Sequence, residues 1–184
     1  ADMKFSVADG VLHHFNVLNY IFDRITIIPD LARSLEESLP EEYRKEARTN
    51  RTVFDRINVA VTVGNGVASY VTRLTADIAE VNASGTIDPE GFLTFKGVFA
   101  LPPALSSSFV RKVSAFSPLM QDGTKTIVIP LADYRGRVND FRLMPDTQYL
   151  AKTLIVSRAK DEIRNLLGDA LGIKRETGDS SDSA

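Results

Sequence analysis

Apolar and polar residues alternate along four segments between residues 53 and 99, which is the pattern of half-buried β-strands. Asn65-Gly66 lies between the first two segments and predicts a two-residue type I′ turn, because both turn positions need positive φ. Pairing outward from that turn places Val61 opposite Tyr70 and brings the apolar residues of both segments to one face. The pattern therefore predicts a β-hairpin with one apolar face.

Two further turns extend this hairpin into an antiparallel meander of four strands. A tight turn at Ala76-Asp77 pairs Leu74 with Ala79 and sets the opposite charges of Arg73 and Glu80 against each other. Residues 88–91 have proline and glycine where a type I turn with a glycine bulge needs them. The predicted apolar face comprises Ile57, Val59, Val61, Val63, Tyr70, Leu74, Val81, Leu93, Phe95 and Phe99.

Helical and extended segments flank the meander. A short strand is predicted at residues 3–7, ending at the turn dipeptide Asp9-Gly10, and further strands at 126–131 and 137–143. Apolar residues cover more than one stripe of a helix predicted over 15–28, which indicates burial on several sides. Further helices are predicted over 30–39, 40–48, 104–116 and, with the most regular spacing, 145–172.

These elements predict an α+β fold: a curved antiparallel β-sheet, a meander of about six or seven strands flanked by helices, with a long C-terminal helix. Gly85, Gly91 and Gly97 allow the sheet to bend. We expect a single domain over residues 1–172, with a helical insert at about 15–48. The charged, Ser-rich residues 173–184 are expected to form a disordered tail.

Composition narrows the functional classes. The chain has 184 residues, 43% of them hydrophobic and 25% charged, which is typical of one soluble globular domain. A formal net charge of -2 gives no overall cationic field for nucleic acid, so no nucleic-acid partner is expected. Cysteine is absent, which excludes disulfides and thiolate chemistry. Because Met3 is not the first residue, we expect a processed chain or a piece of a longer protein.

Catalytic signals are scarce. His13 and His14 are adjacent, so they do not share a helix face, and no carboxylate lies at metal-ligand spacing from them. Gly64-Asn65-Gly66 lacks the Lys-Ser/Thr and the following helix of a phosphate loop. We therefore predict no enzyme activity, no catalytic residue, no metal and no cofactor. Arg135, Arg137 and Arg142 form a small basic cluster, interpreted as a solvated sheet edge or as a contact for a headgroup or partner.

Three short motifs follow one another along the chain: Thr52-Val53-Phe54, then Gly64-Asn65-Gly66, then Gly85-Thr86-Ile87-Asp88. Together with Ile127-Val128-Ile129-Pro130, Gly136 and Pro145-Asp146, they resemble the C-terminal region of the AsmA-like family of bacterial envelope proteins. The resemblance extends over about residues 5–172. Residues 137–140 and the long helical insert depart from the family pattern.

This resemblance implies a periplasmic module of a larger protein that is anchored in the inner membrane through parts outside this chain. It also implies phospholipid transport toward the outer membrane, or control of outer-membrane lipid balance and biogenesis, and no active site. The candidate residues for contact with phospholipid acyl chains are Val59, Val61, Tyr70, Leu74, Val81, Phe95 and Phe99.

Two alternatives to this interpretation stay open. The same apolar residues would form an ordinary filled core in a structural domain of the cell envelope that docks an envelope protein partner and binds no lipid. A closed helix-grip pocket for a soluble apolar ligand is a more distant alternative, and the extra helix at 104–116 counts against it.

Overall fold

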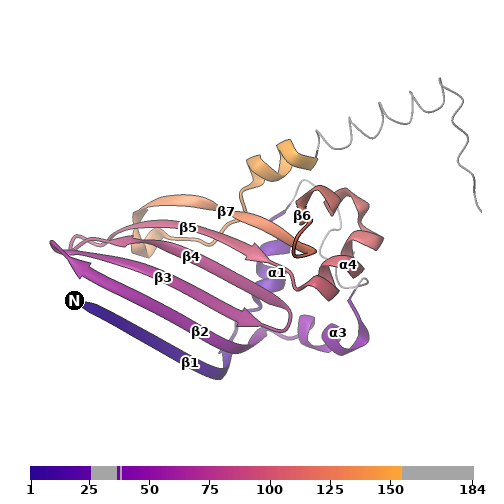
Figure 1. The fold of residues 1–184 in the computed structure, drawn as a ribbon, viewed down its shortest axis with the longest axis horizontal. Helices are drawn as coiled ribbons and strands as arrows, with labels where there is room; N and C mark the ends of the chain where they lie inside the picture. Colours follow the sequence, from indigo (N-terminus) through magenta and orange to yellow (C-terminus); the bar gives the residue numbers. More distant parts are fainter. Residues whose placement is uncertain (26–36, 38, 155–184) are drawn as a thin grey trace, which may run out of the picture.

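The computed structural model describes residues 1–25, 37 and 39–154 (Figure 1). It contains one antiparallel sheet of seven strands in the order β1-β2-β3-β4-β5-β7-β6. The strands are β1 (Asp2–His13), β2 (Arg51–Gly64), β3 (Val67–Ala76), β4 (Ala79–Ile87), β5 (Phe92–Ala100), β6 (Met120–Gln121) and β7 (Thr126–Arg137). The helices are α1 (Val17–Phe22), α3 (Glu41–Ala47) and α4 (Pro103–Lys112), with 3-10 segments η1 (Ser114–Leu119) and η2 (Val138–Asp140). The predicted α+β fold with a curved, helix-flanked meander is confirmed.

The β2–β3 hairpin has the predicted turn and register. Asn65 and Gly66 have φ values of 51° and 79°, as a type I′ turn requires. Val61 lies opposite Tyr70, and Ile57 lies opposite Leu74. The sequence prediction is confirmed here because an Asn-Gly turn admits few other pairings.

The next hairpin is shifted by two residues from its prediction. Asp77 and Ile78 form the turn, so Leu74 lies opposite Val81 instead of Ala79. Ile78 is fully buried, and its burial accounts for the different turn. Arg73 and Glu80 are no longer directly opposite, yet their side chains still form an ion pair of 3.0 Å. A shift of two residues keeps every side chain on its predicted face.

The β4–β5 hairpin again follows the prediction. Ile87 lies opposite Leu93 and Val81 opposite Phe99. Gly91 has a φ of 79°, and the Asp88 carboxylate accepts a hydrogen bond of 2.8 Å from the backbone N–H of Phe92. The predicted turn at residues 88–91 is therefore present.

Strand β1 is longer than predicted and contains a bend. It does not end at Asp9-Gly10 but pairs with β2 as far as His13. Asp9 has a φ of 54°, a left-handed conformation that interrupts the regular alternation of a strand. The alternation in β2 also changes at this bend. From Ile57 onward the odd-numbered residues are the more buried ones, whereas on the other side of the bend Phe54 and Thr52 are buried. The predicted stop was wrong because the left-handed residue bends the strand instead of ending it.

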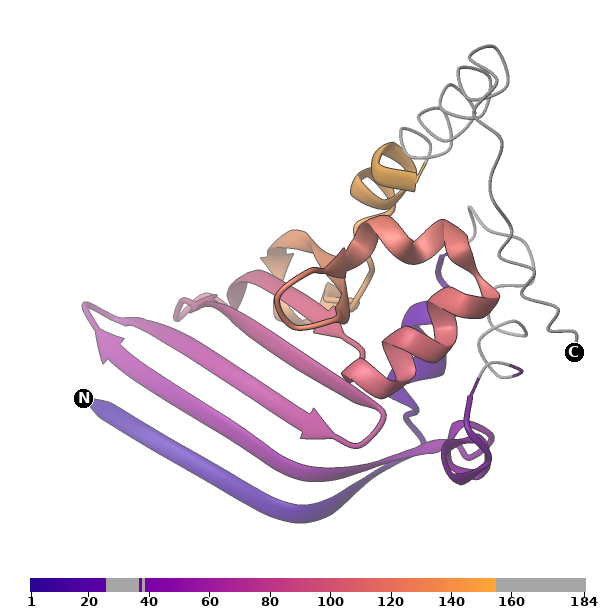
Figure 2. The same cartoon turned by 45° about the vertical axis from the view of Figure 1, so that its right-hand side comes forward.

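An aromatic cluster fills the core between the sheet and the helices. The ring of Phe22 in α1 lies 6.1 Å from Phe99 in β5 and 5.4 Å from Phe109 in α4, measured between centroids. Phe116 in η1 lies 5.0 Å from Phe109. Figure 2 shows α1 and α4 gathered at one end of the sheet, which leaves the β1–β3 side away from this cluster. The helix predicted over 15–28 is thus buried as expected, within its described part.

Buried polar side chains fix the start of α1. The Thr52 hydroxyl donates to the carbonyl of Phe15 at 2.8 Å and accepts from the backbone N–H of Val17 at 2.9 Å. The Asn16 side chain caps α1 by accepting from the N–H of Asn19, and its amide donates to the carbonyl of Thr49 at 2.9 Å. These contacts attach α1 to the segment that leads into β2.

Helix α4 ends before its predicted end. It stops at Lys112, and the chain continues as the 3-10 segment η1, which contains Pro118. Ser106 is fully buried: its hydroxyl donates to the carbonyl of Leu101 at 3.0 Å and accepts from the N–H of Ile127 at 2.8 Å. This serine joins α4 to the ends of β5 and β7.

Strand β7 contains the strand predicted at 126–131 and extends beyond it. It runs from Thr126 to Arg137 and is followed by η2, so the strand predicted at 137–143 was wrong. Pro130 is tolerated inside β7 because its backbone faces the outer side of the strand, where its carbonyl accepts a hydrogen bond from the N–H of Asp146. A register irregularity between Phe95 and Gly97 accommodates an extra residue in β7.

The remaining helical predictions are only partly described. Helix α3 lies within the predicted 40–48 segment and contains an Arg44–Glu41 ion pair of 2.9 Å. Residues 147–154 are helical, and Asp146 caps them by accepting from the N–H of Tyr149 at 2.9 Å. The rest of the predicted C-terminal helix, the predicted tail and most of the 30–39 helix lie outside the described residues. Within the described part of the chain, none of the helices has the length and apolarity needed to cross a bilayer.

Candidate functional site

The apolar face of the sheet has two different surroundings. Over β4, β5 and β7 the helices and η1 cover it, so Phe99, Ile127 and Ile129 are fully buried. Over the N-terminal half of β1, over β2 from Ile57 onward and over β3 as far as Leu74, the same face is only half-buried or exposed. We call this second part the open apolar face; it comprises Met3, Phe5, Val7, Ile57, Val59, Val61, Val63, Tyr70 and Leu74.

The seven residues predicted to contact acyl chains are divided between these two parts. Phe95 and Phe99 lie in the filled core with exposed fractions of 7% and 0%, and Val81 packs against that core. The other four are half-buried on the open apolar face: Val59, Val61, Tyr70 and Leu74. The structure therefore joins a filled core and an uncovered surface on one continuous face.

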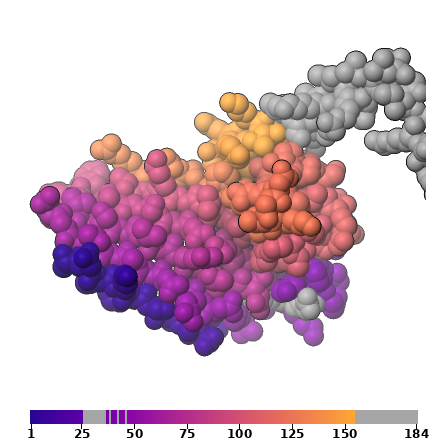
Figure 3. All heavy atoms as spheres, viewed as in Figure 1, coloured from indigo at the N-terminus to yellow at the C-terminus, as the bar shows by residue number. Residues whose placement is uncertain are grey.

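Strand β1 adds residues that the sequence analysis did not select. Phe5 lies opposite Val59 and Val7 opposite Ile57, and both β1 side chains are 55% exposed. Met3 lies opposite Val61 and is 43% exposed. The space-filling view shows β1, in indigo, along the border of the molecule (Figure 3). The alternation of Met3, Phe5 and Val7 was the signal that could have identified them, had their strand been placed beside β2.

The open apolar face contains no charged side chain among its described residues. Tyr70 brings a hydroxyl group to it, and this hydroxyl donates a hydrogen bond of 3.0 Å to the carbonyl of Thr94. Burial raises the pKa of Tyr70 above its ordinary value because it disfavours the phenolate. Thr72, directly opposite Val59, adds a second hydroxyl group, so the face presents hydrocarbon and two neutral hydroxyl groups.

The dimensions of this face suit an extended hydrocarbon chain. Six residue steps separate Ile57 from Val63 along β2, which corresponds to roughly 20 Å at the usual rise of a strand. The hydrocarbon of one bilayer leaflet is about 15 Å thick, half of a core of about 30 Å. One acyl chain can thus lie along these strands over its full length.

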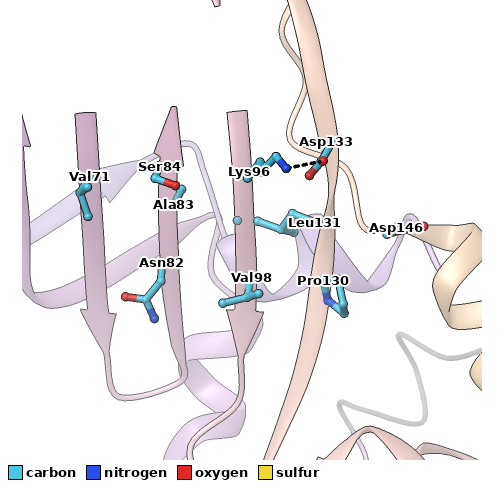
Figure 4. Close-up of a pocket in the computed structure, with 11 residues that line it drawn as sticks. Val71, Asn82, Ala83, Ser84, Lys96, Val98, Pro130, Leu131, Asp133 and Asp146 are labelled. Carbon is cyan, nitrogen blue, oxygen red and sulfur yellow. Dashed lines mark ion pairs between the residues drawn. The ribbon is translucent and has the colours of Figure 1, made fainter. Parts of the chain in front are cut away.

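A shallow hollow of about 620 Å³ lies on the opposite side of the sheet, with lining residues from β3 to β7, next to the register irregularity between β5 and β7. Figure 4 shows Lys96 and Asp133 at this hollow, joined by an ion pair of 3.4 Å, with Val98 and Pro130 beside them. A smaller hollow of about 340 Å³ lies beside α1 and is lined in part by Tyr20. The Arg24 guanidinium lies over the Tyr20 ring, 3.4 Å from its centroid.

The described residues contain no group of three or more His, Cys, Asp or Glu side chains that could hold a metal ion. His13 and His14 are exposed, and their ring centroids lie 6.4 Å apart.

Comparison with known proteins leaves the family open. No protein-family model, no curated protein sequence and no solved structure matches this chain. The resemblance to AsmA-like proteins thus stays a prediction from the order of the sequence motifs.

Proposed function

We propose that this protein is a non-catalytic module that holds phospholipid acyl chains on its open apolar face. The observation that carries the proposal is the continuation of the apolar face beyond the helices, where Phe5 and Val7 are 55% exposed. Contiguous exposed apolar surface of this kind is typical of sites that bind lipid, membrane or protein. The resemblance to AsmA-like proteins supplies the setting: a periplasmic part of a larger, inner-membrane-anchored protein that moves phospholipid toward the outer membrane.

Three features support an acyl chain as the occupant. The open apolar face has no charged side chain, so a hydrocarbon chain meets no desolvated charge there. Its length of roughly 20 Å along β2 accommodates the hydrocarbon of one lipid. The neighbouring aromatic cluster around Phe22 and Phe99 closes the apolar face on the β5 side and bounds the chain laterally.

The test is retention of phospholipid by purified, delipidated protein after incubation with phospholipid vesicles, measured by native mass spectrometry. We expect stoichiometric retention by the wild type and about tenfold weaker retention by a Phe5→Ser, Val7→Ser variant, which loses apolar contact area. The matched control is Val11→Ser, Val53→Ser, a cross-strand pair of exposed valines beyond the bend in the same two strands. A wild-type protein that retains no phospholipid under these conditions would contradict the proposal.

A second candidate function is docking of an envelope protein partner without lipid. It is favoured by strand β1, a twelve-residue edge strand whose outer side has no partner strand in the described part of the chain. This candidate predicts that neither the wild type nor the Phe5→Ser, Val7→Ser variant retains lipid. A proline at Ser6 would weaken docking at the edge without changing lipid retention.

A further inference from the structure

The second face of the sheet carries an excess of positive charge. Along each strand, the residues between those of the open apolar face point their side chains to this other side. Ser6 and Asn58 are one such pair, and their side chains form a hydrogen bond. We call this side the cationic face. In the described ladders it carries Lys4, Arg56, Arg73, Lys96, Arg135 and Arg137, against the carboxylates of Asp2, Glu80 and Asp133.

All six cations are exposed, and only two of them are neutralised by ion pairs in the described structure. Arg73 pairs with Glu80 at 3.0 Å and Lys96 with Asp133 at 3.4 Å. Arg137 lies over the ring of Phe92, and the Asp2 carboxylate accepts a hydrogen bond from Thr62. The face therefore keeps a net positive charge, although the whole chain has a formal charge of -2.

We propose that the cationic face docks on the surface of a bilayer that contains anionic phospholipid. Its cations are distributed from β1 to β7, over roughly 24 Å at the usual strand spacing. Such a spread matches a plane of many headgroup phosphates better than it matches one bound anion. Val71 is 61% exposed and Phe92 46% exposed on the same face, and both can enter the interfacial layer between the headgroups.

Nucleic acid fits this face less well. Proteins that bind single strands combine a basic groove with a series of aromatic side chains on which bases stack. On the described cationic face Phe92 is the aromatic residue of the ladders, and Arg137 already lies over its ring. Serine, threonine and asparagine side chains fill much of the remaining surface, which suits headgroup hydrogen bonding.

This inference is independent of the proposed function, because the two faces lie on opposite sides of the sheet. The test is co-sedimentation of the full chain with vesicles of phosphatidylcholine, alone or mixed two to one with phosphatidylglycerol. We expect binding to the mixed vesicles only, weakening as salt is raised. An Arg56→Glu, Arg135→Glu variant should bind at least roughly tenfold more weakly.

The matched control changes the net charge equally on the other side of the sheet. Arg111→Glu, Lys112→Glu alters two exposed cations of α4, the helix that covers the apolar face. This variant and Phe5→Ser, Val7→Ser should bind mixed vesicles as the wild type does. Equal binding to neutral vesicles, equal loss in the α4 variant, or binding of a single-stranded oligonucleotide in place of vesicles would each overturn the proposal.

Discussion

The Tyr70 hydroxyl reaches across a whole strand to hydrogen bond the Thr94 carbonyl at 3.0 Å, because Gly85 of the intervening strand has no side chain. A Cβ atom at Gly85 would lie 2.7 Å from that hydroxyl and 1.8 Å from the Thr94 carbonyl oxygen. The glycine and the tyrosine are therefore one structural unit, which joins the open apolar face to the covered one.

Removing the hydroxyl tests the value of this hydrogen bond. Tyr70→Phe should lower the free energy of unfolding by about 1 kcal/mol, because the half-buried carbonyl of Thr94 loses its partner. Urea denaturation measures this change. Tyr149→Phe, in an exposed tyrosine of the C-terminal helix, is the control and should leave stability unaltered.

Filling the glycine should cost more than removing the hydroxyl. Gly85→Ala places a methyl group against backbone that cannot move without breaking the β4–β5 ladder, so we expect a loss of about 2 to 3 kcal/mol. Gly64→Ala, where an added Cβ meets nothing within 4 Å, should be nearly neutral. Thermal unfolding of the two variants measures this difference. Equal unfolding midpoints would contradict the close approach of the Thr94 carbonyl to Gly85.

Alkaline pH should weaken the contribution of Tyr70. Its folded pKa is raised by burial above the ordinary value of 10.0, so the unfolded chain releases this proton first. The stability that Tyr70 contributes is fully present below pH 10 and is lost as the pH rises from there through the folded pKa. The stability difference between wild type and Tyr70→Phe should therefore shrink above pH 10. A difference that stays constant across that range would contradict the assignment.

Thr52 should be the polar residue whose loss most affects the placement of α1. Thr52→Val keeps the shape of the side chain but leaves the N–H of Val17 and the carbonyl of Phe15 without their partner. We expect a loss of about 2 kcal/mol or more in the free energy of unfolding. Thr62→Val, in the same strand but exposed, should change stability by less than about 0.5 kcal/mol. Hydrogen exchange of the α1 amides would locate the effect.

The accuracy of the sequence predictions followed the local chemistry of each turn. Asn65-Gly66 and residues 88–91 contain residues that demand particular φ values, and both registers were predicted correctly. The Asp77-Ile78 turn contains no residue with positive φ, so only the burial of Ile78 in the folded core selects it. Sequence periodicity carries no information of that kind.

The division of the apolar face was beyond sequence analysis for a similar reason. Val59 and Phe99 occupy equivalent alternating positions, yet one is half-buried and the other fully buried. The difference depends on where α1, α4 and η1 pack, and this is a property of the tertiary fold. The positive charge of the cationic face likewise could not be predicted from the formal net charge of the chain, which is close to zero. The net charge is summed over both faces of the sheet, whereas strand alternation places the charged side chains of a strand on one face or the other.

The left-handed residue Asp9 makes β1 sensitive to changes in length. Deleting or inserting a single residue between Lys4 and Ala8 would exchange the two sides of the strand's first half. Phe5 would then move among the arginines, and Lys4 would be carried to the hydrocarbon side. The N-terminal half of β1 should accordingly tolerate many point substitutions but almost no single-residue insertion or deletion. An insertion of two residues would keep each side chain on its original face of the sheet.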